Sequence, residues 1–203
     1  MEIDPVYLDE LGLLLEVLQI QGVENATIAG GCLRDMLLQK PIKDIDVFYT
    51  GDIPELNTTP AFGNVKECGM EYENTGWQVT HDMTHKTFGI PIQMIHVKNK
   101  TIKEHIDLFP TCLSRISYTK DGGLEGIDSQ FIAHSVDKTL VFDRKVDQAY
   151  LDKMKAKFPD WEVIFIKEEF NPVKKPSSEF IDWLSGVDSI KVVQPGSTTS
   201  PQF

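Results

Sequence analysis

The sequence has few cysteines and no long run of apolar residues. Cys32, Cys68 and Cys112 are an odd number without metal-type spacing, so we expect reduced thiols and no disulfide framework. No apolar stretch approaches the roughly 18 residues that a membrane-spanning helix needs. The first ten residues also lack the basic region and apolar stretch of a signal peptide. We therefore expect a cytoplasmic protein without a membrane partner.

Basic residues are scarce relative to acidic ones. The chain has 20 Lys and Arg against 31 Asp and Glu, which gives a formal net charge of -11. A protein that holds a long nucleic acid usually neutralises many phosphates with a basic face. The charge therefore argues against an extended nucleic-acid partner, although it allows small basic patches. Hydrophobic residues make up 41% of the 203 residues, which is enough for the core of one ordinary domain.

Hydrophobic periodicity in the first fifty residues switches between helix and strand. Asp4 is a suitable N-cap and Pro5 a suitable first helical residue. The pattern predicts a helix from Pro5 to before Gly22, a strand over 26–29, a helix over 32–38 that Pro41 ends, and a strand over 44–50. We predict an α+β fold, in which helices pack mainly on one face of a mixed β-sheet.

The rest of the chain predicts more strands than helices. Residues 51–69 are rich in glycine and proline and are predicted to be mostly loop, with one short helix. Strands are predicted over 77–80, 92–97, 112–118, 130–133, 139–142 and 161–166, and helices over 101–106, 150–158 and 177–186. We expect one domain over 1–186, with core motifs in 26–118 and a C-terminal elaboration in 145–186, and then a flexible tail over 187–203.

The segment between the first strand and the next carries the chemistry. Gly30 and Gly31 end a strand before a helix, where backbone N–H groups can approach an anion because no Cβ intervenes. Asp44 and Asp46 stand two residues apart on a strand, which places both carboxylates on one face. Such hard oxygen ligands select Mg²⁺ or Mn²⁺ over zinc. A phosphate site beside a metal site predicts nucleotidyl transfer from a nucleoside triphosphate.

The order of these motifs resembles that of a known family. G-G-x-x-R-D at 30–35, an apolar helix, a basic loop with Lys40 and Lys43, and D-I-D-V-F at 44–48 follow one another. This order resembles the head domain of the poly(A) polymerase and CCA-adding branch of the polymerase-β-like nucleotidyltransferase superfamily. It is also similar to small, single-domain nucleotidyltransferase-like proteins that bacteriophages encode. The resemblance is specific over 26–49 and weaker over 90–118.

The resemblance implies a role for each motif residue. Asp44 and Asp46 are expected to hold Mg²⁺ or Mn²⁺ and to take part in catalysis, and Arg34 and Asp35 to open the intervening helix. The residues expected to bind the nucleotide are Gly30, Gly31, Arg34, Lys43 and Arg115. The fold implied is the palm-like nucleotidyltransferase fold.

The sequence departs from the family pattern at the third carboxylate. The family places this acid on a neighbouring strand, and in the matching strand, 92–97, the sequence has Gln93. Asp107 is the best candidate to replace it, either as a third catalytic metal ligand or as a ribose contact. Arg115 lies in a segment similar to the family's R-R-D block, where the double arginine is absent, and is predicted to be a displaced triphosphate clamp.

Histidines offer a weaker alternative site. His81 and His85 have H-x-x-x-H spacing, which on a helix would place both rings on one face for zinc. The segment lacks the Glu of the protease motif and a third ligand at a recognised spacing, and it lies between two predicted strands. We therefore predict a polar hairpin connection there. Trp161 and Trp183 are predicted to be core or docking residues.

These patterns predict a Mg²⁺-dependent nucleotidyltransferase that uses an NTP such as ATP. It would move a nucleoside monophosphate to an acceptor hydroxyl and release pyrophosphate. The acceptor is expected to be a protein, a small molecule or a short RNA end, because the chain after Tyr118 is too short for the long helical domains of RNA-acting family members. The alternative is a phage-type protein of this fold with weakened catalysis, which binds a nucleotide or a host protein in the host cytoplasm. A dinucleotide-binding domain is disfavoured, because the turn lacks G-x-G-x-x-G.

Overall fold

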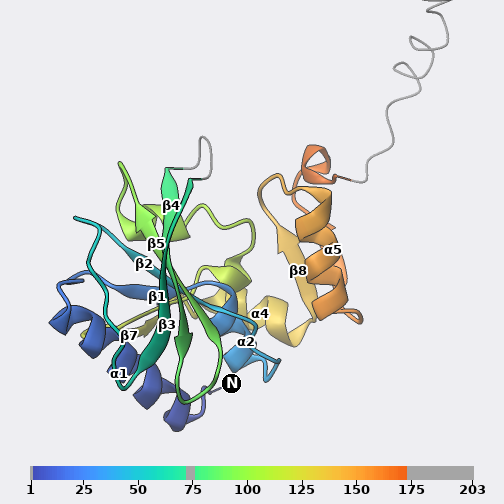
Figure 1. Ribbon diagram of the computed structural model, residues 1–203. Helices are drawn as coiled ribbons and strands as arrows, with labels where there is room; N and C mark the ends of the chain where they lie inside the picture. Colours follow the sequence, from blue (N-terminus) through green and yellow to red (C-terminus); the bar gives the residue numbers. More distant parts are fainter. Residues whose placement is uncertain (1, 72–75, 173–203) are drawn as a thin grey trace, which may run out of the picture. The chain divides into compact units, whose positions relative to one another are not determined.

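The computed structural model describes residues 2–71 and 76–172 (Figure 1). The chain up to Pro172 forms one compact unit. The predicted helix over 177–186, Trp183, the predicted domain end at 186 and the tail over 187–203 lie outside the described residues. Within the described ranges, we find no helix that combines the length and the apolar character needed to cross a membrane.

A seven-stranded sheet forms the centre of the fold (Figure 1). Its strands lie in the order β3-β4-β5-β2-β1-β6-β7. The β2–β5 pair is parallel and the other five pairs are antiparallel, so the sheet is mixed, as predicted. The strands are β1 (Thr27–Ala29), β2 (Ile45–Tyr49), β3 (Phe62–Glu71), β4 (Trp77–His85), β5 (Pro91–Val97), β6 (Ser117–Thr119) and β7 (Gly123–Glu125).

Helices and a small second sheet complete the unit. The helices are α1 (Pro5–Ile20), α2 (Gly31–Leu37), α3 (Ile102–Ile106), α4 (Ser129–Val136) and α5 (Gln148–Lys157), with 3-10 turns η1 (Cys112–Ser114) and η2 (Glu168–Phe170). Strands β8 (Thr139–Phe142) and β9 (Glu162–Phe165) pair in parallel, and Figure 1 shows α5 beside β8. The α+β fold class is confirmed.

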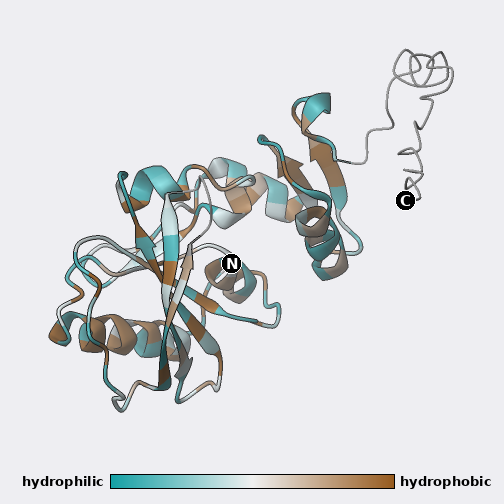
Figure 2. Ribbon diagram, turned by 45° about the horizontal axis from the view of Figure 1, so that its top comes forward, coloured by the Kyte–Doolittle hydropathy of each residue, from teal (hydrophilic) through white to brown (hydrophobic). Residues whose placement is uncertain are grey.

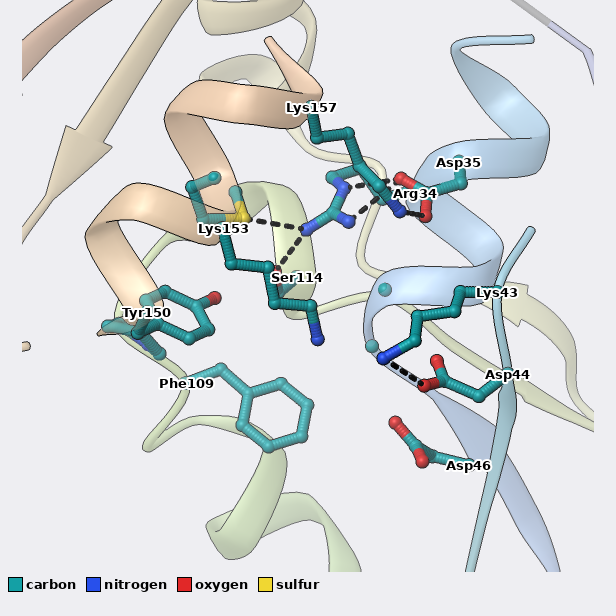
Figure 3. A pocket seen from close by; sticks show the side chains of 14 residues that line it. Arg34, Asp35, Lys43, Asp44, Asp46, Phe109, Ser114, Tyr150, Lys153 and Lys157 are labelled. Carbon is teal, nitrogen blue, oxygen red and sulfur yellow. Dashed lines mark hydrogen bonds and ion pairs between the residues drawn. The ribbon is translucent and has the colours of Figure 1, made fainter. Parts of the chain in front are cut away.

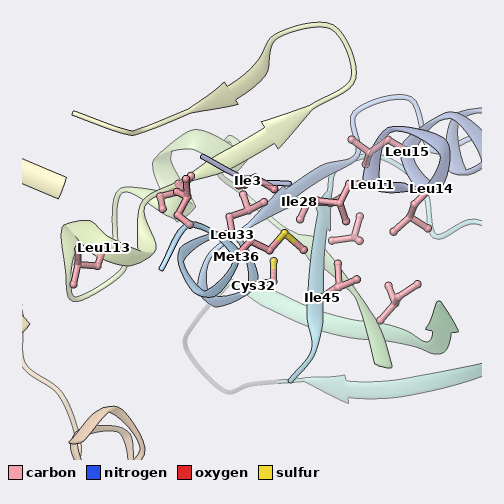
Figure 4. Packing of buried hydrophobic residues seen from close by; sticks show 14 of the residues in the cluster. Ile3, Leu11, Leu14, Leu15, Ile28, Cys32, Leu33, Met36, Ile45 and Leu113 are labelled. Carbon is pink, nitrogen blue, oxygen red and sulfur yellow. The ribbon is translucent and has the colours of Figure 1, made fainter. Parts of the chain in front are cut away.

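The two faces of the large sheet bury different side chains. Helices α1 and α2 cover one face, where Leu14, Leu33 and Val47 belong to the larger hydrophobic core (Figure 4). The other face carries a smaller core, in which Phe48 and Ile106 pack together beneath α3. Hydrophobic and hydrophilic residues alternate along helices and strands (Figure 2), as expected of elements with one buried side. Helices therefore lie mainly on one face.

Local signals explain why α1 and α3 begin where they do. The carboxylate of Asp4 accepts a hydrogen bond from the Val6 backbone N–H at 2.9 Å, and Pro5 follows as the first helical residue. The Thr101 hydroxyl accepts from the Glu104 N–H, and the Glu104 carboxylate accepts from the Thr101 N–H. This capping box satisfies two backbone groups at the start of α3. Both predicted helix starts are confirmed.

Four predicted segments differ from the structure. In the strand predicted over 112–118, residues 112–114 instead form the 3-10 turn η1, which the Thr111 hydroxyl caps, and the strand begins only at Ser117. Residues 62–71 form strand β3, where a loop with a short helix was predicted, because an edge strand with two register shifts shows no clear alternation. Residues 130–133 lie in α4 and not in a strand, since Asp128 caps the helix by accepting from the Phe131 N–H. The polar hairpin connection predicted at His81 and His85 is part of β4, and both rings are buried.

Candidate active site

Gly30 and Gly31 form the turn that joins β1 to α2, and other segments of the chain lie close to it. Gly30 has φ +89°, a conformation that side-chain-bearing residues rarely adopt. A Cβ atom there would lie 3.3 Å from the Phe109 ring, and one at Gly31 would lie 3.3 Å from the Arg34 guanidinium. Gly30 therefore needs glycine for its backbone conformation, and the Phe109 ring and the Arg34 guanidinium lie close against the turn.

Strand pairing carries the carboxylate pair to this turn. Thr27 lies opposite Phe48, and Ile28 opposite Val47, so the end of β1 meets the beginning of β2. Gly30, Gly31, Asp44 and Asp46 line one pocket of about 180 Å³, which we call the carboxylate pocket. Figure 3 shows both carboxylates at the same side of this pocket. The predicted phosphate and metal residues are brought together.

The environment of Asp46 is unusual for a carboxylate. Burial and the nearby charge of Asp44 raise the pKa of Asp46 to about 6, while Lys153 and Lys43 act in the opposite direction. Asp44 is partly exposed and its carboxylate lies 4.0 Å from the Lys43 ammonium. A carboxylate pair of this kind also attracts a cation, which makes Asp44 and Asp46 suitable for a divalent ion.

The neighbouring strand supplies an amide at the position of a third carboxylate. Gln93 on β5 is in register with Asp46 on β2, and it donates a hydrogen bond to Asp82 on β4 at 3.3 Å. Across residues 2–71 and 76–172, no group of three or more His, Cys, Asp or Glu side chains is placed to hold a metal ion. The residues present fit a Mg²⁺ ion that takes two carboxylates and completes its shell with water and substrate oxygens.

Arg34 and Asp35 are buried beside the pocket and connect three elements. The guanidinium of Arg34 pairs with Asp35 at 2.8 Å and donates to the Ser114 hydroxyl at 3.1 Å. The Asp35 carboxylate also forms an ion pair with the Lys157 ammonium on α5. These contacts tie α2 to η1 and α5, so Arg34 is placed at the pocket wall with most of its hydrogen-bonding capacity already used (Figure 3).

Helix α5 contributes site residues that sequence analysis missed. Tyr150, Lys153, Met154 and Lys157 all line the carboxylate pocket, and Figure 3 shows Lys153 extending from α5 toward the two aspartates. Their spacing of i, i+3, i+4 and i+7 indicates that the four residues share one helix face, but not that this face meets the carboxylate pocket.

The pocket has a local charge opposite to that of the chain. Its described lining includes four cationic side chains against three carboxylates. The net local charge is therefore +1, within a chain of net charge -11. An electropositive lining favours an anionic ligand such as a phosphate chain. The cations are Arg34, Lys43, Lys153 and Lys157, and the carboxylates are Asp35, Asp44 and Asp46.

Asp107 and Arg115 are not brought to this pocket. Asp107 caps the end of α3, has a side chain that is 55% exposed, and lies 3.6 Å from the Lys103 ammonium. Arg115 donates to the Phe109 carbonyl at 2.6 Å and pairs with Asp143 at 2.5 Å. Neither residue lines the carboxylate pocket. Both are occupied by local contacts that hold the chain around α3 and η1.

A second, larger pocket adjoins the first. It has a volume of about 550 Å³ and shares four lining residues with the carboxylate pocket. Beyond those, its walls include Gln93 and side chains of the smaller core. The shared residues are Asp44, Asp46, Phe109 and Lys153. The aspartates therefore face two neighbouring spaces of different character.

Comparisons with known proteins identify the fold. A CCA-adding enzyme in its apo form I has 15% identity to this chain and a TM-score of 0.51, and the match covers 83% of this chain and 42% of that one. The Thermotoga maritima CCA-adding enzyme complexed with tRNA has 18% identity and a TM-score of 0.50, with the same two coverages. No protein-family model and no curated protein matches the chain. The chain therefore spans less than half the length of these enzymes and has their nucleotidyltransferase fold.

Proposed function

We propose that the protein is a nucleotidyltransferase that transfers a nucleoside monophosphate from an NTP to an acceptor hydroxyl. The observation that carries the proposal is the convergence, in one pocket, of the glycine turn, the carboxylate pair and the lysines of α5. A turn without side chains, two acids and an excess of positive charge are the features that bind and activate a triphosphate. The fold that the chain shares with CCA-adding enzymes supports the proposal of nucleotidyl transfer.

The triphosphate would lie against Gly30 and Gly31 with its charge facing the lysines. Lys43 and Lys153 both lower the pKa of Asp46, and the Lys43 ammonium lies 4.0 Å from the Asp44 carboxylate. Arg34 and Lys157 already pair with Asp35, so they contribute positive potential from the wall. We assign direct phosphate contact to Lys153, because its chain extends into the pocket (Figure 3).

Asp44 and Asp46 would hold Mg²⁺ or Mn²⁺, which when bound neutralises triphosphate charge and lowers the pKa of the attacking hydroxyl. The acceptor oxygen forms a bond to the α-phosphorus while the bond to the bridging oxygen breaks, and pyrophosphate leaves toward the glycine turn. The hydroxyl proton passes to water, because the carboxylates of Asp44 and Asp46 would be engaged by the metal. Lys153 stabilises the charge that develops on the transferred phosphate.

One observation favours a second candidate function. Gln93 occupies the register position beside Asp46 where a third carboxylate is expected, and an amide oxygen cannot supply its charge. A phage-type protein with this fold could bind a nucleotide or a host protein without turnover. The carboxylate pair and the surrounding cations would then serve binding alone.

Two measurements separate these functions. Calorimetry with each NTP and Mg²⁺ tests binding, and transfer of label from α-labelled NTP to components of a cell lysate tests turnover. We expect binding and transfer by the unaltered protein, and loss of transfer in Asp44→Asn and Asp46→Asn. Asp9→Asn, an exposed change on α1, is the matched control and is expected to leave both unchanged. Binding without transfer, equally strong in all variants, would contradict the enzyme proposal.

A further inference from the structure

The larger pocket beside the carboxylate pair has aromatic walls. We call it the aromatic chamber and define it by Phe48, Trp77, Ile95, His105, Leu108 and Phe109, which line it together with the aspartates. The His105 ring centroid lies 5.3 Å from that of Phe48, 5.7 Å from that of Phe109 and 6.2 Å from that of Trp77. The four rings thus form one connected cluster, in which Trp77 and Phe109 keep part of their surface exposed, and flat aromatic ligands stack well on exposed rings.

Several of these rings also serve the smaller hydrophobic core beneath α3. Phe48 is buried there, and Trp77 and Phe109 pack against it while keeping part of their surface open. Burial lowers the pKa of His105, so its ring is neutral at physiological pH. Packing alone does not account for a space of about 550 Å³ beside these rings, which lies within the range of small-molecule pockets.

Reaction geometry decides which substrate the chamber receives. The attacking and leaving oxygens of a phosphoryl transfer lie roughly in line through the phosphorus. If pyrophosphate leaves toward Gly30 and Gly31, the acceptor hydroxyl approaches from the opposite side of the carboxylate pair. The aromatic chamber shares the two aspartates with the carboxylate pocket and includes neither glycine, so it lies on the acceptor side.

Charge decides the class of acceptor. Apart from the residues shared with the carboxylate pocket, Lys100 is the only charged side chain among the described residues that line the chamber. A nucleic-acid end would bring several phosphates to a chain of net charge -11 with few cations to meet them. The walls suit an uncharged ligand better.

These observations extend the proposed function and rest on it. We propose that the aromatic chamber binds the acceptor, and that the acceptor is an uncharged small molecule of nucleoside size that carries an aromatic ring and a free hydroxyl group. The ring lies among Trp77, His105 and Phe109, and the hydroxyl faces Asp44 and Asp46. Phe109 lines both pockets and separates the ring of the acceptor from the triphosphate.

Calorimetry with a non-hydrolysable ATP analogue and Mg²⁺ comes first. Absence of analogue binding at this step contradicts the proposed function itself, before any acceptor is added. Adenosine is then titrated into the saturated complex as a neutral aromatic probe, and methyl riboside as a probe with hydroxyls and no ring. We expect adenosine to bind beside the analogue at least about tenfold more tightly than methyl riboside, because stacking supplies the difference.

Matched variants locate the probe. Leu108 lines the chamber and is 41% exposed, while Leu13 on α1 is 43% exposed and lies outside both pockets. Leu108→Glu is expected to weaken adenosine binding about tenfold, because a charge replaces apolar wall. Leu13→Glu is expected to leave it unchanged, and neither change should alter binding of the analogue. Trp77→Leu, which removes a ring of the wall, is expected to weaken adenosine binding by a similar factor.

Five results would overturn the proposal while leaving nucleotide binding intact. In the first, adenosine does not bind the saturated complex, and in the second it displaces the analogue, which would make the chamber the site of the donor base. Equal affinities for methyl riboside and adenosine would show that the aromatic ring of the probe does not contribute to binding. Insensitivity of adenosine binding to Leu108→Glu would place the probe elsewhere. Much tighter, salt-dependent binding of a triadenylate would make the acceptor an RNA end.

Discussion

The carboxylate pocket and the aromatic chamber share four lining residues and differ in the rest. The first is lined by four cations and three acids, whereas the second combines rings and aliphatic side chains with Gln93, Lys100 and the shared charged residues. The two aspartates stand at the boundary and face both. Under the proposed function, this division would orient the substrates, because a triphosphate would be stabilised on one side of the pair and an aromatic group on the other. Changes at residues that line one pocket, or that line the boundary between the two, test this division.

The largest effect is expected from Asp35→Asn. Asp35 is buried and pairs with both Arg34 and Lys157, so the substitution leaves two cations without their anion. Breaking a buried pair in this way is expected to lower the free energy of unfolding by about 3 kcal/mol. Urea denaturation measures the change, and Asp9→Asn is the surface control. A loss of stability no larger than that of Asp9→Asn would show that the ion pairs among Arg34, Asp35 and Lys157 do not hold α5 in place.

Asp46→Asn is expected to raise stability while it abolishes transfer. The pKa of Asp46 is about 6 in the folded protein against 3.8 as the ordinary value, so its ionised form destabilises the native state. Stability from this group is present below pH 4 and is lost as the pH rises through 6. The substitution should therefore add about 1 to 3 kcal/mol at pH 7 and nothing below pH 4. Equal stabilisation at both pH values would contradict the electrostatic cause.

Lys153→Ala tests the charged side of the boundary. It is expected to weaken NTP binding about tenfold, because it removes the cation that extends into the carboxylate pocket. Lys155 is exposed on the same helix and lines neither pocket, so Lys155→Ala is the matched control for charge and helix position. Calorimetry at two salt concentrations measures both variants. Equal losses of NTP affinity in the two variants would show that the effect comes from the overall charge of α5 and not from Lys153 itself.

Gln93→Glu is expected to have the smallest effect. It adds a carboxylate in register with Asp46 and should tighten Mn²⁺ binding about fivefold through the added ligand charge. Without metal, the new acid faces Asp46 and Asp82, so a lower melting temperature is expected that Mn²⁺ restores. Thermal unfolding with and without Mn²⁺ checks this, with Gln130→Glu, exposed on α4, as control. Unchanged metal affinity would show that position 93 does not face the ion.

The part of the site that could be predicted lies within seventeen residues of sequence. Gly30, Gly31, Asp44 and Asp46 belong to one strand, turn, helix and strand, so their pattern alone indicates that they meet. Lys153 and Lys157 reach the same pocket from more than a hundred residues away, and no local pattern encodes that distance. In the sequence, both resemble ordinary solvent-facing lysines, because the position of α5 is known only from the fold.

The fold, like the site, could be predicted only where a local sequence pattern is clear. Helix α1 and strand β2 carry strong periodicity and were predicted within a residue or two at each end. Strand β3 is an edge strand with register shifts and shows no clear alternation, and α4 is a short helix whose start depends on its Asp128 cap. The aromatic chamber could not be predicted, because Phe48, Trp77 and Phe109 come from three separate elements.

The position of α5 in the chain has a consequence for the order of assembly. Arg34 contacts Met154, and Asp35 contacts Lys157, across 120 and 122 residues. Contacts of such sequence separation form late, because a long loop must close before they contribute. During synthesis the large sheet can fold while the last strands and α5 are still being made. The emerging chain would then hold its aspartates in place before two of the four cations of the pocket arrive.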